Sequence, residues 1–388
     1  DENGQALPWL AVRWDSQSDG RRWQFWLRTD VRFHDGTPLS AATVVQSLTA
    51  HECGGCPWQA VHVAGDSIVF ESENSVPNLP ALLANSRYAI ERRDDAGNPV
   101  GTGPFKFSSG ANGAVMLAAV EDGWHPRAYV NAIEVRGGRA LRDQWMDVSA
   151  GRADVVEVPA DQLRRAQQER MSVVASRNTE LLALVFDESE PAAQDARLRA
   201  AFALSIDRTA LLNVIFQKQG ESTASLLPNW LSGYSFVFPG SADVTKAREL
   251  RAQVEHAPEL TLRVDGSDPV LQLVADRIIL NARDAGIAVR AVPAAGRSTL
   301  RLVRIHAEQE TPSAAFNEIA LQLTRDVRPV PDDLTAVFRA EQELLAKHTI
   351  VPLLYTPRAL ALGTRVHDLV VANDGAVRSA DFWLEETK

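Results

Sequence analysis

Residues 23–40 read Trp23-Gln24-Phe25-Trp26-Leu27-Arg28-Thr29-Asp30-Val31-Arg32-Phe33-His34-Asp35-Gly36-Thr37-Pro38-Leu39-Ser40. Apolar side chains alternate with polar ones from Trp23 to Leu27, with one exception, and this period of two predicts a strand. Gly36 allows the positive φ of a tight turn. Ser40 is a good N-cap for the helix that should follow. The apolar face of that helix comprises Val44, Val45 and Leu48.

A second turn is predicted at Gly101-Thr102-Gly103-Pro104, directly before the strand-like Phe105-Lys106-Phe107. Two glycines and a proline within four residues favour a fixed bend. A phosphate-binding loop is the competing interpretation. It requires a longer spacing between the glycines, a Lys-Ser/Thr ending and a following helix, and this stretch has none of them. We therefore interpret these glycines as structural.

The middle of the chain predicts a buried strand followed by two helices. Residues 181–186 are all apolar, as expected for a strand that is buried on both faces. Residues 195–206 place their apolar side chains at helical spacing. Asp207 can end this helix and cap a second one that extends to about Phe216.

The part from residue 260 onward predicts alternating strands and helices. Strands are expected at 260–264 and 287–292, joined by a helix at 270–282 that Gly286 closes. Such a unit should form parallel strands with a right-handed crossover. Further helices are expected at 313–321 and 332–347, before a strand at 349–355.

Composition limits the class of protein. The chain has 388 residues, enough for two lobes with separate cores. Its 40 basic and 50 acidic residues give a net charge of −10, which argues against nucleic acid or an anionic membrane as a partner. No apolar run reaches the roughly 18 residues of a membrane-spanning helix. The chain opens at Asp1 without a signal peptide, so we expect that it was processed or trimmed.

The stretches at 23–40, 101–107 and 195–208 follow one another in an order that resembles family 5 extracellular solute-binding proteins. The strand at 349–355 resembles that family's hinge strand. The resemblance implies an α/β fold: a two-lobed periplasmic-binding-protein-like clamp (type II, cluster C) with mixed sheets, flanking helices and two hinge strands. Lobe 1 would comprise residues 1–182 and 356–388, and lobe 2 residues 183–355. One strand and a loop that the family usually carries before Leu7 should be missing.

The resemblance also implies a function. The protein would capture a small ligand, a peptide or similar solute, between its lobes and deliver it to an ABC permease in the membrane. It would be a monomer without cofactor, metal or nucleic acid. It would be periplasmic or at the cell surface, with a lipid anchor conceivable in the full-length precursor. The alternative is a degenerate clamp that serves as a sensory or docking domain without transport.

The family topology points to six ligand-binding positions. The competing interpretation of each is ordinary packing or surface pairing. Peptide-binding members hold the peptide amine with an Asp in the second lobe, and Asp326 is the only isolated candidate in the matching region. An Arg suits a carboxylate, and aromatic rings stack on flat groups. The six are Arg87, Tyr88, Trp230, Tyr234, Tyr355 and Arg358.

The sequence leaves three interpretations of Cys53 and Cys56 open. They could form a short-loop disulfide, remain two unreactive thiols, or belong to a metal or redox site, where His51 and His62 could supply nitrogen ligands for zinc. Catalytic patterns are missing from the chain. No histidine pair has the spacing of a zinc protease, and no serine lies in a nucleophile elbow. His34 is expected to pack within its turn, and Asp332-Asp333 to form an acidic pair at a helix start. We therefore do not expect an enzyme.

Overall fold

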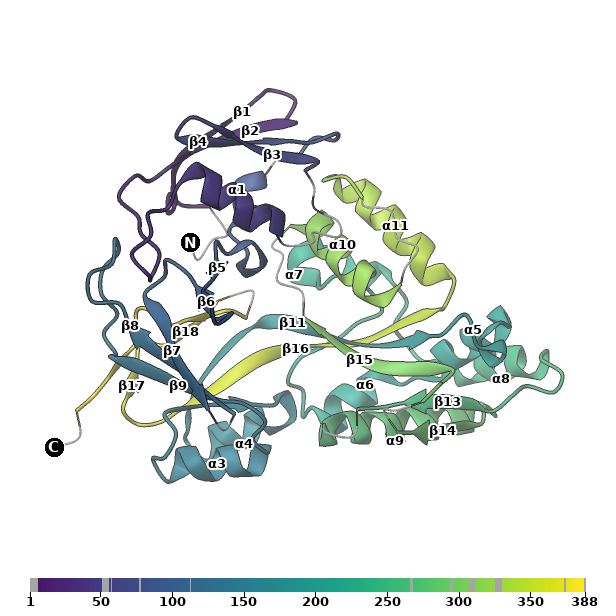
Figure 1. Ribbon diagram of the computed structural model, residues 1–388. Helices are drawn as coiled ribbons and strands as arrows, with labels where there is room; N and C mark the ends of the chain where they lie inside the picture. The colour runs from purple at the N-terminus through teal and green to yellow at the C-terminus, as the bar shows by residue number, and fades with distance from the viewer. Residues whose placement is uncertain are drawn as a thin grey trace. The chain divides into compact units, whose positions relative to one another are not determined.

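The computed structural model describes residues 6–50, 56, 58–76, 78–111, 113–265, 268–293, 296–306, 311–324, 330–372 and 375–386 (Figure 1). The chain forms two compact units. The first comprises Asp1–Glu157, Ala361–Ala372 and Ala376–Lys388, and the second comprises Val158–Leu360 and Asn373–Gly375. The lobe limits expected near 182 and 356 fall inside strands β11 (Ser172–Phe186) and β16 (Ile350–Leu362), and as lobe limits they stay a prediction.

The first unit opens with an antiparallel sheet in the order β1-β2-β4-β3. Trp23 and Phe25 of β2 are buried against Phe70 of β4, whose ring meets that of Phe25 edge to face at 5.5 Å. The strand predicted from the alternation at 23–27 is therefore confirmed. The bounds are β1 Ala11–Ser16, β2 Arg22–Leu27, β3 Ala60–Ala64 and β4 Ser67–Glu71.

Helix α1 (Ala41–Ala50) begins where the sequence predicts. The Thr43 amide donates a 3.2 Å hydrogen bond to Ser40 Oγ, so Ser40 satisfies one of the free amides of the first turn. Val44 and Leu48 are buried on the face toward the sheet, and both belong to its apolar cluster.

The two glycine-containing turns of the first unit are joined through His34. Its amide donates to the Gly101 carbonyl at 2.9 Å, and its Nε2 lies 2.9 Å from the Gly103 carbonyl oxygen. Trp124 Nε1 donates to the Thr102 carbonyl between them, also at 2.9 Å. Burial lowers the pKa of His34. The His34 turn and the Gly101–Gly103 bend are therefore joined by hydrogen bonds, a contact that the sequence did not predict.

Short elements complete the first unit. Strands β7, β8 and β9 form an antiparallel sheet, and the remaining strands pair as β5 with β6, β17 with β20 and β18 with β19. Their bounds are α2 Leu79–Leu83, β5 Arg92–Arg93, β6 Pro99–Val100, β7 Phe105–Ala111, β8 Ala114–Ala119, β9 Ala132–Arg136, α3 Leu141–Ser149, β17 Val366–His367, β18 Val370–Val371, β19 Val377–Arg378 and β20 Trp383–Leu384. Strand β10 (Val155–Val158) contains the division between the units.

The second unit is built on a mixed sheet in the order β16-β11-β15-β13-β14, with β12 (Glu221–Ser222) paired to β16. Strand β13 is parallel to both β14 and β15, and β11 is antiparallel to β15. The predicted parallel strand–helix–strand unit is therefore confirmed, with α9 (Pro269–Asp284) as its helix. The remaining bounds are β13 Leu260–Arg263, β14 Val289–Val292 and β15 Leu300–His306.

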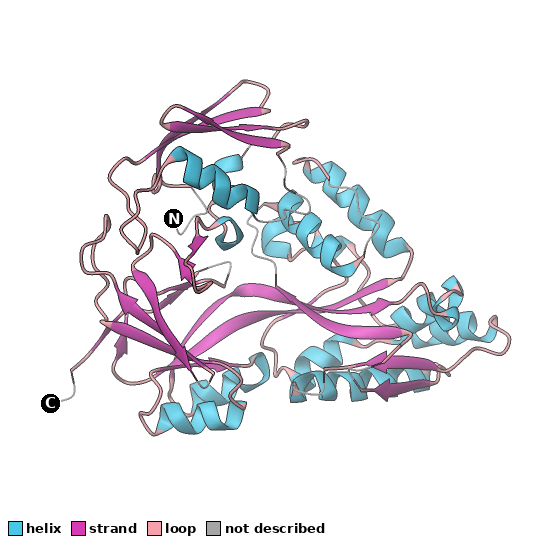
Figure 2. Ribbon diagram, in the orientation of Figure 1, coloured by secondary structure: helices cyan, strands magenta, loops and turns pink. Residues whose placement is uncertain are grey.

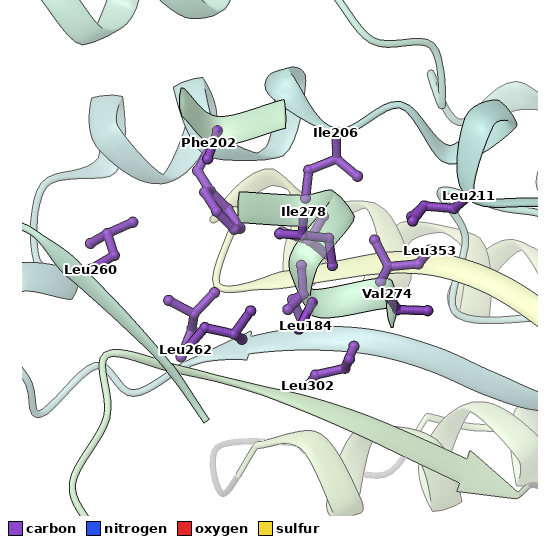
Figure 3. Packing of buried hydrophobic residues seen from close by; sticks show 14 of the residues in the cluster. Leu184, Phe202, Ile206, Leu211, Leu260, Leu262, Val274, Ile278, Leu302 and Leu353 are labelled. Atoms are coloured by element: carbon purple, nitrogen blue, oxygen red, sulfur yellow. The ribbon is translucent and has the colours of Figure 1, made fainter. Parts of the chain in front are cut away.

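The last six residues of β11 are apolar because helices cover both faces of the sheet (Figure 2). Leu182, Leu184 and Phe186 lie in one cluster with α5 and α9, and the alternate residues lie in a second cluster with α10 and α11. Figure 3 shows the first of these clusters, with Leu184 and Leu302 beside Val274 and Ile278.

Aspartates begin most helices of the second unit. The carboxylate of Asp195 accepts from the Arg197 amide, and that of Asp333 from the amides of Thr335 and Ala336. The helix predicted after Asp207 is confirmed: the Asp207 carboxylate accepts from the Ala210 amide, and α6 continues without a break into a π-helical turn, Leu211–Ile215. The bounds are α4 Leu163–Gln168, α5 Ala196–Ser205, α6 Arg208–Ala210, α7 Asn229–Ser232, α8 Val244–Ala252, α10 Pro312–Leu323 and α11 Leu334–Ala346.

Candidate functional site

Arg87 and Tyr88 belong to a 3₁₀ turn of the first unit, Ser86–Tyr88, which Asn85 caps. The Tyr88 ring is buried and packs against Trp58 at a centroid distance of 5.2 Å. Arg87 is exposed, and its guanidinium lies 5.1 Å from the centre of the Tyr88 ring. Tyr88 is thus part of the core, and Arg87 is the member of this pair that solvent reaches.

Tyr234 and Tyr355 both lie in the apolar cluster under α10 and α11. Between them sits Glu341 of α11, which is fully buried. Glu341 accepts hydrogen bonds from Ser225 Oγ at 2.7 Å and from backbone amides of the same loop. Burial raises the pKa of Glu341, and burial together with the nearby Glu341 raises the pKa of both tyrosines.

Trp230 and Arg358 come from distant parts of the chain to one short segment of β11. Trp230 Nε1 donates to the Asn178 carbonyl at 3.0 Å, and the Arg358 amide donates to Ser176 Oγ at 3.0 Å. The guanidinium of Arg177 lies 5.3 Å from the centre of the Trp230 ring. Both Trp230 and Arg358 are partly exposed.

His306 ends β15 beside this segment, directly across from Glu180 in the register of β11. Its buried Nδ1 has no hydrogen-bond partner among the described residues. A Cβ on Gly375 would lie 2.8 Å from the His306 ring, so the ring packs against the backbone there. The guanidinium of Arg358 donates to the Gly375 carbonyl at 3.3 Å.

Trp230, Arg358, Arg177 and His306 form what we call the β11 surface. It combines two guanidinium groups, a partly exposed indole and an imidazole, which suits a carboxylate-bearing ligand with a flat group. Within the described residues, no group of three or more His, Cys, Asp or Glu side chains could hold a metal ion.

Sequence reasoning missed Arg177 and His306. The available signal was the polar run from Ser176 to Glu180, which continues β11 ahead of its apolar end. Two other sequence predictions concern residues outside the described part, Asp326 and Cys53. Cys56 is disulfide-bonded. All six predicted ligand-binding residues lie in the described part of the chain. That they contact a ligand stays a prediction.

The comparisons with known proteins agree with one another. Residues 5–305 match the family model described as bacterial extracellular solute-binding proteins, family 5 Middle. The chain is 27% identical over 310 residues to the probable D,D-dipeptide-binding periplasmic protein DdpA of Escherichia coli, covering 72% of this chain and 60% of that protein. It is 26% identical over 346 residues to the peptide transport periplasmic protein SapA of Salmonella typhimurium, covering 76% and 62%. The chain thus spans about three fifths of these relatives.

Solved structures show the same fold. The Staphylococcus aureus NikA structure in complex with Ni(L-His)2 aligns with a TM-score of 0.85 and 16% identity, over 99% of this chain and 92% of that one. The Helicobacter pylori DppA structure in complex with the peptide STSA aligns with a TM-score of 0.84 and 18% identity, over 98% and 90%. The expected α/β binding-protein fold is therefore confirmed, and the chain belongs to the bacterial extracellular solute-binding proteins of family 5.

Proposed function

We propose that this protein is an extracytoplasmic solute-binding protein that captures a peptide or similar small solute and delivers it to an ABC importer. The observation that carries the proposal is the family match over residues 5–305 together with the binding-protein fold. Relatives named as periplasmic peptide-binding proteins support the ligand class. The same proposal holds that the protein captures its ligand between two lobes and acts as a monomer. It also holds that the full-length precursor carries a lipid anchor.

The β11 surface is the proposed contribution of the second unit to the ligand site. Arg358 and Arg177 supply guanidinium groups for a ligand carboxylate, and Trp230 supplies a ring for an apolar side chain or a planar metal complex. Arg87 is the exposed candidate of the first unit. We assign Tyr88, Tyr234 and Tyr355 a supporting role, because they are wholly or half buried.

We expect this protein to bind a solute and not to catalyse a reaction. The β11 surface has no nucleophile paired with a base, which a hydrolase would require. Among the helices that the structure describes, none has the length and apolar character needed to cross a bilayer. Nothing in the comparisons favours the alternative of a sensory or docking domain over a transport receptor.

Titration calorimetry against dipeptides, tetrapeptides, free amino acids and nickel–histidine complexes tests the proposal. One ligand class should bind saturably and, at about a hundred times its Kd, stabilise the protein by about 2.7 kcal/mol. Trp230→Phe and Arg358→Gln should each weaken binding by about tenfold. Trp383→Phe, at a partly exposed indole of the first unit, is the matched control and should bind normally. Absence of saturable binding by the folded protein would favour the sensory or docking domain.

A further inference from the structure

A pocket of about 670 Å³ lies in the second unit, where β11 and β13 end and β15 begins. Three arginines line it: Arg263 at the end of β13, Arg301 near the start of β15, and Arg297 in the preceding loop. Phe186, Leu300 and Leu323 form an apolar part of the wall. Its volume lies in the range of small-molecule sites.

Two of these arginines are held side by side by the sheet. Arg263 and Arg301 are direct partners in the parallel pairing of β13 with β15, so their side chains leave the same face. Burial and the adjacent charge of Arg263 lower the pKa of Arg301, while Asp187 opposes that change. Like charges placed opposite each other on neighbouring strands destabilise a sheet. An anion bound between them would relieve this repulsion.

These arginines have no ion-pair partner in the part of the chain that the structure describes. Within the described residues, no ion pair joins Arg263, Arg297 or Arg301 to a carboxylate. Arg301 reaches the Gln322 carbonyl, at the end of α10, at a long 3.5 Å. Arg297 is exposed and Arg263 is partly exposed, so both can turn toward a ligand.

Asp187 lies close enough to all three arginines for their charges to interact, but one of its carboxylate oxygens already accepts hydrogen bonds from Ser189. Its Oδ1 accepts hydrogen bonds from Ser189 Oγ at 2.6 Å and from the Ser189 amide at 3.0 Å. These hydrogen bonds, and more weakly the charges of Arg297 and Arg263, lower the pKa of Asp187. Glu188 is also on the wall, so the described lining residues carry three positive and two negative charges, an excess of one positive charge in a chain of net charge −10.

The pocket is remote from the β11 surface. At one end of β11 the Arg358 amide binds Ser176, and at the other the Phe186 amide donates to the Thr349 carbonyl beside the pocket. Phe186 lies ten residue steps along the strand from Ser176, which is roughly 33 Å at about 3.3 Å per step. A ligand in the pocket therefore cannot be the one that touches Trp230 or Arg358.

We propose that this pocket is a second binding site that takes a small phosphorylated molecule with an apolar body. Three guanidinium groups suit a phosphate better than a carboxylate, because one arginine fork already satisfies a carboxylate, whereas a phosphate carries more charge and more acceptor positions. The apolar wall formed by Phe186, Leu300 and Leu323 would receive the rest of the molecule.

Titration calorimetry with phenyl phosphate, inorganic phosphate and benzoate at fixed ionic strength tests this site. Phenyl phosphate should bind saturably and more tightly than the other two probes. Arg263→Gln and Arg297→Gln should each weaken its binding by about tenfold. Arg297 is exposed, so its variant should fold normally. Asp187→Asn should strengthen binding, because it removes a competing negative charge.

Arg290→Gln is the matched control, since Arg290 is exposed on the neighbouring strand β14 and its ion-pair partner among the described residues is Glu259, at 3.3 Å. It should bind phenyl phosphate as the unaltered protein does. Three results would overturn the proposal: no saturable binding of phenyl phosphate to the folded protein, benzoate binding as tightly as phenyl phosphate, or equal weakening by Arg290→Gln and Arg297→Gln. Binding of peptides or nickel complexes at the β11 surface should be unaffected by Arg297→Gln, so the two sites are tested separately.

Discussion

The hydroxyl of Tyr355 donates a hydrogen bond to the backbone carbonyl of Leu226, 129 residues earlier in the chain. This bond connects strand β16 to the loop that carries Ser225 and leads into α7, the helix of Trp230, inside a buried apolar cluster. The buried side chain of Tyr355 thereby holds in place the loop that precedes Trp230 of the β11 surface.

Replacing Tyr355 by Phe should destabilise the protein without removing a ligand contact. The Leu226 carbonyl would lose its partner in a buried site, at a cost of about 1–3 kcal/mol. Urea denaturation measures the change in the free energy of unfolding. Tyr129→Phe, at a tyrosine that is 71% exposed, should be close to neutral. Normal stability with lost ligand binding would show instead that Tyr355 acts in the site.

Glu341 should make the stability depend on pH. Burial raises its pKa above the ordinary 4.5, against the opposing effect of its hydrogen bonds. An acid whose folded pKa is raised contributes stability that is complete below the unfolded pKa and is lost as pH rises through the folded pKa. Glu341→Gln should therefore gain stability relative to the unaltered protein as the pH rises above about 4.5.

Free energies of unfolding, measured by urea at several pH values, give that difference. The exposed neighbour Glu343 on the same helix offers the control Glu343→Gln, which should follow the unaltered protein at every pH. A constant difference between Glu341→Gln and the unaltered protein would mean that Glu341 does not titrate in this range.

Arg208 should be important for stability although it pairs with no carboxylate among the residues that the structure describes. It is 6% exposed, and its guanidinium donates to the Pro352 carbonyl at 2.7 Å and to the Gly240 carbonyl at 3.2 Å. Burial lowers its pKa to about 10, so it remains charged at neutral pH. Arg208→Met would leave two carbonyls unpaired and should cost about 2–4 kcal/mol. Thermal unfolding of Arg283→Met, at an exposed arginine of α9, should change little, and equal losses in both would contradict this role.

Gly220 should not tolerate a side chain. It has φ +125°, and a Cβ there would lie 2.5 Å from the Tyr355 carbonyl oxygen. Gly220→Ala should therefore lose about 3 kcal/mol or more of stability. Gly233 has φ +72° with open space around it, so Gly233→Ala should lose only about 1 kcal/mol in the same denaturation experiment. Equal losses would show that backbone strain alone matters.

The sequence predicts the parts of this fold that follow a single local period. The alternation at Trp23–Leu27 and the helical spacing of α9 are each set by one buried face, and both are confirmed. The first half of β11 was not predicted, because Ser176 and Asn178 carry the polar pattern of a loop. Their strand geometry depends on partners more than a hundred residues away, such as Arg358.

The candidate site was harder to predict, for a related reason. An aromatic residue in a loop or hinge strand suggests a ligand contact, yet the sequence does not show that the Tyr355 hydroxyl meets Leu226. Arg177 gives no signal of its own, since its place over Trp230 exists only after β11 and α7 have formed. Contacts between residues far apart in the sequence thus determine which of the candidate ligand-binding residues face solvent.

Strand β16 lies next to β11 in the sheet of the second unit, yet it follows all the other strands of that sheet along the chain. A nascent chain that ends before Ile350 can pair β11 with β15 but not with β16, and the Leu226 carbonyl still lacks the Tyr355 hydroxyl. Pairing over such sequence distances is slow, and an apolar strand with one open edge is prone to aggregation. The nascent chain should therefore lack a complete core in its second unit until β16 has been made, and its dependence on chaperones should fall sharply once residue 362 has emerged.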